Sequence, residues 1–264
     1  MVAPAVRLGG LHGVGDPAAR PVHSHPAMLL IFDDNRLSDS PFIERVWRSH
    51  SEGSGLFVSV ATSHWDLVVT RLAGKPTLTL KGPETRASEV LCPADGEWLG
   101  IRFKAGVFMP ETPISGLVDG NRNLPSDART FRLHGRAWEY PTFDNAETFV
   151  ARLARAGLIE RDPAVAAALH GDELALSERG AQRHFLFATG MSHAALKQIE
   201  RARHATNLLR GGVSIADTVG EAGFFDQAHL SRSLSRLIGL TPTRIAREER
   251  QLSFLYKTQP PARA

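Results

Sequence analysis

The sequence predicts an α+β protein, in which an N-terminal antiparallel β-barrel or sandwich-like domain precedes an all-helical domain. Residues 56–103 hold short runs of β-branched and apolar residues between turns that contain Gly or Pro. After Trp138, apolar residues recur at helical spacing between capping residues. Because 264 residues is long for one domain, we expect a β-rich domain over 1–155, a helical domain over 160–250 and a tail over 251–264.

Composition excludes several classes of protein. With 42% hydrophobic and 22% charged residues, the chain has the composition of a folded globular protein. Its longest apolar runs, such as residues 27–32, are far shorter than the roughly 18 residues of a membrane span. The single cysteine, Cys92, excludes an internal disulfide and a cysteine-rich zinc site. Pro and Gly also interrupt the N-terminus where a secretory signal needs an apolar stretch, so we expect a cytoplasmic protein.

The β-rich domain begins with residues 1–40, whose Gly, Pro, His and Asp content predicts an irregular lead-in. A short helix is predicted for Pro41–Trp47, because Ser40 is a good N-cap and proline suits the first helical position. Cys92 precedes Pro93 in a predicted turn and is interpreted as a plain free thiol. Strands are predicted at Leu56–Val60, Trp65–Thr70, Thr77–Leu80 and Leu99–Phe103.

The helical domain shows a start and a stop signal for each helix. The predicted helices run from the Asp144 cap to about Gly157, from Asp162-Pro163 to Gly171, from the Ser177 cap to Gly190, and from Ala194 to Leu209. In the last of these, Leu196, Ile199, Ala202, Ala205 and Leu208-Leu209 are expected to face inward.

Two further helices follow with the spacing of a helix-turn-helix unit. Ser214 caps a short helix that stops at Gly223, and residues 226–237 form a second helix. In that second helix Leu230, Leu234 and Leu237 share one buried side. Ala228, Ser231, Arg232 and Ser235 then lie on the opposite side, with Gln227 at its edge.

The positive charge of the chain is concentrated in its C-terminal third. Residues 174–250 carry eleven Lys or Arg against seven Asp or Glu, a net charge of +4, while the whole chain has only +3. Ten of the eleven cations are arginine. Arginine binds phosphate and guanine in a bidentate manner, so this part of the chain is the one suited to nucleic acid.

The second unit resembles the signature of the AraC/XylS family of transcription regulators. The resemblance is carried by Gly223-Phe224-Phe225-Asp226-Gln227-Ala228-His229-Leu230-Ser231-Arg232-Ser233-Leu234 and by Gly239-Leu240-Thr241-Pro242. Residues 177–185 with Thr189-Gly190 resemble the first recognition helix of that family, and Arg201 and Ala205 match its linker helix. The resemblance covers residues 163–248. It implies that the helical domain has two helix-turn-helix units joined by a linker helix, whose two recognition helices enter successive major grooves of double-stranded DNA.

The resemblance also implies which side chains contact DNA. The implied base contacts are Arg179, Gln182 and Arg183 in the first recognition helix, and Gln227, His229, Ser231 and Arg232 in the second. Arg236, Arg244 and Arg247 are interpreted as phosphate contacts, which position the protein without specifying sequence. The alternative for His229 and Arg232 is a solvated helix face, which the agreement of caps, apolar side and polar side disfavours.

The N-terminal part resembles the β-rich effector domain of some of these regulators, through residues 42–47, 64–67 and 100–107. This implies a sensing or dimerising role, with a small-molecule effector, RNA polymerase and a second copy of the chain as partners beside DNA. Trp65 and Arg102 are the ligand-binding candidates. Their alternatives are a core role for Trp65 and an outward, solvated position for Arg102, and both alternatives are favoured.

An enzyme is the alternative class of function. His23 and His25 have the spacing of two metal ligands on one strand of a cupin-like barrel, which suggests a metal- or ligand-dependent enzyme with an accessory helical domain. They lie in a Pro-flanked segment without a carboxylate cluster. We therefore expect no metal, no cofactor and no catalytic residue, and metal analysis of the purified protein tests this.

Overall fold

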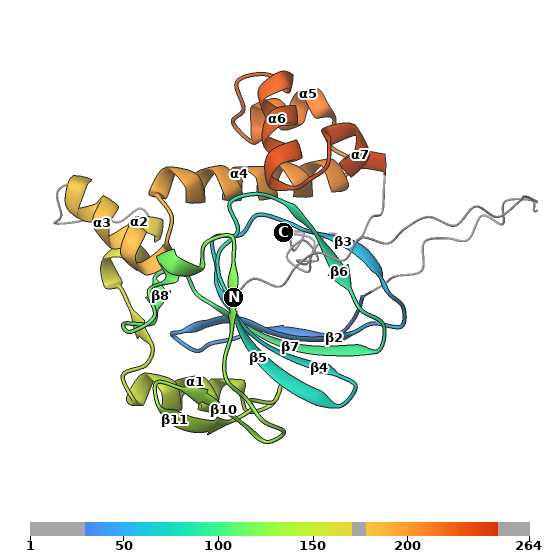
Figure 1. Ribbon diagram of the computed structural model, residues 1–264. Coiled ribbons are helices and arrows are strands. Elements are labelled where there is room, and N and C mark those ends of the chain that lie inside the picture. Colours follow the sequence, from blue (N-terminus) through green and yellow to red (C-terminus); the bar gives the residue numbers. More distant parts are fainter. Residues whose placement is uncertain (1–29, 171–177, 248–264) are drawn as a thin grey trace, which may run out of the picture.

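The computed structural model describes residues 30–170 and 178–247 and forms a β-rich part below a helical part (Figure 1). The main sheet is antiparallel with the strand order β1-β2-β7-β4-β5-β9. Its strands are β1 (Ile31–Leu37), β2 (Ile43–His50), β7 (Gly96–Phe103), β4 (Asp66–Leu72), β5 (Lys75–Lys81) and β9 (Asn121–Asn123). The ladder of β3 (Gly55–Ser59) and β6 (Ser88–Cys92) lies above this sheet. The predicted sandwich-like architecture is therefore confirmed, and the main sheet is open rather than a closed barrel.

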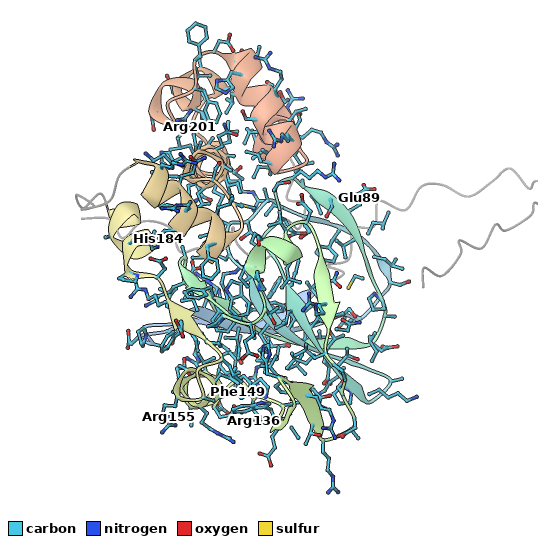
Figure 2. The ribbon with its side chains drawn as sticks, turned by 60° about the vertical axis from the view of Figure 1, so that its left-hand side comes forward. Glu89, Arg136, Phe149, Arg155, His184 and Arg201 are labelled. Carbon is cyan, nitrogen blue, oxygen red and sulfur yellow. The ribbon has the colours of Figure 1, made fainter. Side chains whose placement is uncertain are left out.

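One face of the main sheet packs on the lower layer of the molecule. That layer contains the hairpin of β10 (Thr130–Leu133) and β11 (Arg136–Glu139) together with α1 (Ala146–Arg155). Leu67, Ile101 and Leu78 from the sheet share one apolar core with Phe131 and Phe149. Figure 2 shows Phe149 at this lower end, away from the helical part. The core explains why α1 forms where its apolar residues recur at helical spacing.

An ion pair fixes α1 to the first strand. Arg36 of β1 donates to both carboxylate oxygens of Glu147, at 2.5 and 2.8 Å, and Ser38 donates a third hydrogen bond at 2.8 Å. The hydrogen bond from Arg36 lowers the pKa of Glu147 to about 2. The carboxylate thus stays charged at neutral pH and holds the edge of the sheet to the helix.

The helical part is organised around its longest helix. Its helices are α2 (Pro163–His170), α3 (Glu178–Thr189), α4 (His193–Arg210), α5 (Ile215–Glu221), α6 (Gln227–Leu237) and α7 (Pro242–Arg247). Helix α4 runs between α2–α3 at one end and α5–α7 at the other (Figure 1). Ser214 caps α5 with its side chain, as predicted, and Asp226, predicted as the first residue of the next helix, caps α6. Among the described helices, none has the length and apolar character needed to cross a bilayer.

Several predicted elements need correction. Residues 41–47 do not form a helix, because β2 occupies Ile43–His50 and pairs with both β1 and β7. A capping signal at Ser40-Pro41 is thus overridden by the pairing of a whole strand. Residues 31–37 of the expected irregular lead-in form β1. Cys92 ends β6 rather than lying in a turn, and Asn145 rather than Asp144 precedes α1. Ser177 and Gly171 lie outside the described residues.

The second helix-turn-helix unit is joined to the β-rich part by backbone hydrogen bonds. The N–H of Ala61 donates to the carbonyl of Leu237, and that of Ala87 donates to Arg236, each at 2.8 Å. Both acceptors are the last residues of α6. Val60 and Ala61 are fully buried in the same apolar core as Leu230 and the other inward residues of α4–α7. The end of α6 is therefore anchored on the loops that follow β3 and precede β6.

The first unit contacts the β-rich part at a second point. Helix α3 ends at Gly190, whose φ is +71°, and a Cβ there would lie 2.7 Å from Val118. Glycine is thus needed both for the turn and for the close approach to the short helix η1 (Ile114–Leu117). Phe187 of α3 meets Phe108 of β8 (Val107–Phe108) edge to face, with ring centroids 5.0 Å apart. β8 itself pairs with β12 (Glu160–Arg161), just before α2.

Candidate nucleic-acid interface and an internal cavity

Helix α6 has one buried side and one exposed polar side. Leu230, Leu234 and Leu237 are buried, and the Asp226 carboxylate accepts the His229 backbone N–H at 2.6 Å to cap the first turn. Gln227, Ala228, Arg232 and Ser235 are exposed on the other side. The helix therefore presents an amide and a guanidinium outward from a rigid apolar base, which is how a recognition helix reaches base edges.

His229 and Ser231 are only partly exposed. The ring of His229 packs edge to face on Phe224, with centroids 5.2 Å apart, and its Nδ1 lies 3.5 Å from the backbone nitrogen of Phe225. His229 therefore orders the turn before α6, a role that sequence reasoning did not assign. Phe225, which sequence reasoning also left without a role, is 90% exposed beside the first turn of α6.

Helix α3 presents a second basic surface. Arg179, Gln182 and Arg183 are all exposed, while Phe185 and Ala188 face the core. Next to Arg183, the Nδ1 of His184 lies 2.6 Å from the Asp162 carboxylate, which also accepts the Ala164 N–H at the start of α2. Figure 2 shows His184 at this joint. This hydrogen bond positions α3 against the start of α2.

The predicted phosphate contacts lie at the far end of the helical part. Arg236 is exposed in the last turn of α6, Arg247 is exposed on α7, and Arg244 is partly buried. Together with Arg232, they give α6 and α7 a positive exposed surface. No bound DNA tests these contacts, so they stay predictions.

The comparison with protein families agrees with this arrangement. Residues 171–248 match the model of a family described as a helix-turn-helix domain. No curated protein and no solved structure matched the chain. Fold and match together define a DNA-binding protein of the helix-turn-helix class. Within that class, the match supports an AraC/XylS-type regulator, in agreement with the resemblance seen in residues 223–242.

A cavity of about 300 Å³ lies between the main sheet and the β3–β6 ladder. Its apolar walls come from both sides of this gap: Phe32, Trp47, Val68 and Trp98 on the sheet, and Phe57, Val60 and Val90 beside or on the ladder. Trp65 is not among the lining residues. Its indole N–H donates to the Val107 carbonyl at 2.7 Å, and its ring stacks on Phe103 in the lower core.

One end of the cavity is formed by a row of polar residues across the sheet. Arg45, Arg102, Asp66, Lys81 and Asn121 are direct cross-strand partners in that order, and we name them the charged row. Cross-strand partners point to the same face of a sheet. All members except Arg45 line the cavity.

Arg102 is buried, so the expectation of an outward, solvated arginine is wrong. The side chain is 6% exposed and donates from Nε and Nη2 to the two carboxylate oxygens of Asp66, at 2.8 and 2.7 Å. The prediction assumed a half-buried strand with one face in solvent. It failed because both faces of this sheet are covered. The charge of Asp66 compensates that of the guanidinium.

Beside the charged row, His64 is held neutral under helix α4. Its side chain is 12% exposed, and its Nε2 lies 3.0 Å from the Glu44 carboxylate. Burial, together with the nearby charges of Arg102 and of Arg203 on α4, lowers the pKa of His64 to about 3. The imidazole therefore belongs to the contact between the sheet and the helical part.

The low pKa of His64 makes stability depend on pH. An unfolded histidine takes up a proton below about pH 6.5, whereas folded His64 resists protonation down to about pH 3. Stability should thus fall as the pH drops below 6.5. When the pH is lowered from 7 to 5, the free energy of unfolding of His64→Gln should fall by about 2 kcal/mol less than that of the wild type. Urea titration at both pH values measures this difference. His204→Gln, on the exposed face of α4, is the control and should behave as the wild type. Equal pH slopes for all three proteins would contradict the buried, neutral state.

The enzyme alternative depended on a metal site. Among residues 30–170 and 178–247, no three His, Cys, Asp or Glu side chains gather in a way that would hold a metal ion. His23 and His25 lie outside the described residues. Cys92 is buried at the cavity, and burial raises the pKa of its thiol.

Proposed function

We propose that this regulator binds specific DNA sequences through α3 and α6 and is controlled by a small molecule in the β-rich part. The base contacts would be Arg179, Gln182 and Arg183 on α3 and Gln227 and Arg232 on α6, with Ser231 and His229 at the edge of the α6 surface. Arg236, Arg244 and Arg247 would contact phosphates. In this proposal, residues 1–155 sense and residues 160–250 read DNA in the cytoplasm.

One observation carries the control by a small molecule: the cavity wall continues into the anchor of α6. Val60 and Thr62 line the cavity, and between them Ala61 donates to the last turn of α6. Glu84 also lines the cavity, and its backbone pairs with that of Thr62 through two 2.9 Å hydrogen bonds. A molecule that moves this wall therefore displaces the end of the second recognition helix.

The same observation favours a ligand over dimerisation as the controlling event. The cavity lies inside one chain, and its wall is joined to α6 of that same chain through the Ala61 hydrogen bond. If a ligand controls the protein, the change in DNA affinity that the ligand causes should not depend on protein concentration. If dimerisation controls the protein, DNA affinity should depend on protein concentration. Measuring DNA affinity at several protein concentrations separates the two. A second copy of the chain and RNA polymerase remain expected partners of the DNA-bound regulator.

Selection of bound fragments from the source genome tests the DNA-binding function. The full chain should enrich a motif with two elements about one helical turn apart, at about 150 mM salt, where non-specific binding is weak. The double variant Gln227→Ala, Arg232→Ala should lose the element read by α6. If the wild type enriches no sequence at any salt concentration, sequence-specific binding is refuted.

Arg232 and Arg247 should differ in what they contribute. Arg232→Ala is expected to weaken binding to the selected motif by about 1–3 kcal/mol and to relax preference at one base position, because arginine pairs with guanine. Arg247→Ala, also an exposed arginine, should weaken binding evenly across sequences and reduce its salt dependence. Affinities for a set of single-base variants of the motif, measured by fluorescence anisotropy, give both results. Equal, sequence-independent losses would rule out base contact by Arg232.

A further inference from the structure

We propose that the cavity takes a small, flat, apolar molecule that carries an oxygen hydrogen-bond acceptor, either a carboxylate or a neutral carbonyl. This inference rests on the proposed control by a small molecule and specifies its chemistry. It follows from three properties of the cavity: its aromatic walls, the buried polar groups in its lining that have no hydrogen-bond partner among the described residues, and its size.

The walls suit a flat molecule. Trp47 lies against the backbone of β7 at Gly100, where a Cβ would come within 2.0 Å of the indole ring. Glycine at this position therefore gives the indole its place in the wall. Trp98 on β7 and Phe57 on β3 add further aromatic surface, and Val68 and Val90 complete an apolar lining. Aromatic and aliphatic walls of this kind bury the body of a ligand, while a few polar groups orient it.

At the polar end, the Asp66 carboxylate and one oxygen of Glu84 already accept hydrogen bonds, and one buried donor remains. Both carboxylate oxygens of Asp66 accept from Arg102, and Oε2 of Glu84 accepts from Ser59 at 2.7 Å and lies 3.1 Å from the Lys81 ammonium. In contrast, Nη1 of Arg102 is buried without a hydrogen-bond partner in the described part of the chain. Arg102 as a residue is only 5% exposed.

A second buried polar group also lacks a hydrogen-bond partner within the described part of the chain. The Oγ of Ser49, a residue that is 2% exposed and lines the cavity, also has no hydrogen-bond partner among the described residues. A buried polar group without a partner costs free energy, and a ligand that supplies the partner recovers it. A guanidinium can only donate, so the ligand must accept.

The size of the cavity limits the ligand. A volume of about 300 Å³ lies at the small end of ligand-binding sites. It suits a molecule of one or two fused rings with a short polar group. Carboxylates and neutral carbonyls share the required acceptor, and matched probes distinguish them.

Calorimetric titration of the full chain, without DNA, tests the inference with three naphthalene probes of the same shape. They are 2-naphthoate, which is an anionic acceptor, 2-acetylnaphthalene, which is a neutral acceptor, and 2-naphthylmethylammonium, which is a cationic donor. We expect at least one acceptor to bind at least tenfold more tightly than the ammonium ion. Stronger binding of 2-naphthoate identifies an anionic ligand, and stronger binding of the ketone a neutral one. Equal binding of the ammonium ion, or no acceptor bound at 1 mM, overturns the proposal.

Two variants and a control test whether the probe binds in the cavity. Val90→Trp fills the cavity and should weaken binding of the acceptor at least tenfold. Glu89→Trp is the control and should leave the affinity within twofold, because Glu89 is exposed on the same ladder and neither Glu89 nor its cross-strand partner Val58 lines the cavity. Ser49→Ala is a milder variant that removes one hydrogen-bond donor. It should weaken binding of the acceptor probe about threefold and leave the affinity for the ammonium probe unchanged. Equal affinities for wild type and Val90→Trp would overturn the location.

The two proposals fail in different ways. If the wild type enriches a DNA motif and no acceptor binds, only the ligand chemistry is wrong. If an acceptor binds and no motif is enriched, the cavity assignment holds while sequence-specific DNA binding fails. Circular dichroism of each variant confirms that a loss of binding is not a loss of fold.

Discussion

Replacing Asp66 by alanine is expected to lower the free energy of unfolding by about 3–5 kcal/mol, the typical cost of leaving a buried charge without its partner. Arg102 would keep its charge in a site that is 5% exposed. Its neighbour on the other side in the charged row is Arg45, so no second carboxylate stands opposite it in the row. Urea unfolding at pH 7 measures the loss, through the midpoint at constant slope.

A double variant separates the charge from the packing. Asp66→Ala combined with Arg102→Leu removes both charges, so it should be more stable than Asp66→Ala alone by at least about 2 kcal/mol, because an apolar replacement of a buried ion pair is often nearly neutral. If the double variant is the less stable of the two, the side chains contribute chiefly through their shape. A loss below about 1 kcal/mol for Asp66→Ala would show that Arg102 reaches solvent.

The second large effect is expected at the contact between the two parts of the chain. Ala61→Glu places a carboxylate at a fully buried position within the core shared with α4–α7. Burying a charge without a partner costs several kcal/mol, so the β-rich and helical parts should separate instead. Scanning calorimetry should then show two unfolding transitions where the wild type shows one. Coupling between the naphthalene probe and DNA affinity should disappear.

Ser88→Glu is the matched control for this variant. It adds the same charge at an exposed position in β6, one residue beyond the Ala87 hydrogen bond to α6. Its unfolding should remain a single transition, with a midpoint within about 2 °C of the wild type. If Ala61→Glu also unfolds in one transition at an unchanged midpoint, the contact at Ala61 contributes little to holding the two parts together.

The helical part was the more predictable half because its signals are local. Ser214 and Asp226 stand beside the helices that they cap, and Leu230, Leu234 and Leu237 repeat at helical spacing in a short segment. An apolar stripe and its caps are visible within a dozen residues. The exposed polar side of α6, which is part of the candidate DNA surface, followed directly from that stripe.

The cavity was not predictable from the same signals. The members of the charged row are separated in sequence by up to 76 residues, between Arg45 and Asn121, and only the strand register brings them together. Alternation along a strand identifies two faces without saying what covers each one. Trp65 and Arg102 were the pocket candidates, although the core was favoured for Trp65 and solvent for Arg102. Trp65 lies in the core, whereas Arg102, Trp47 and Trp98 line the cavity. β1 and β2 were missed because their local signals resemble a loop and a helix start.

The anchoring of both units on the β-rich part bears on the DNA that this regulator accepts. Helix α3 is held at Gly190 by η1, and α6 is held at its last turn by the loops around Ala61 and Ala87. Without these contacts, α3 and α6, the proposed recognition helices, would be connected only through the packing of the helical part. Because both helices are attached to the same β-rich part, their separation is fixed. If the spacing between the two elements of an operator is changed by one base pair, the intact chain should lose binding to the whole operator. The loss should include the element whose bases are unchanged.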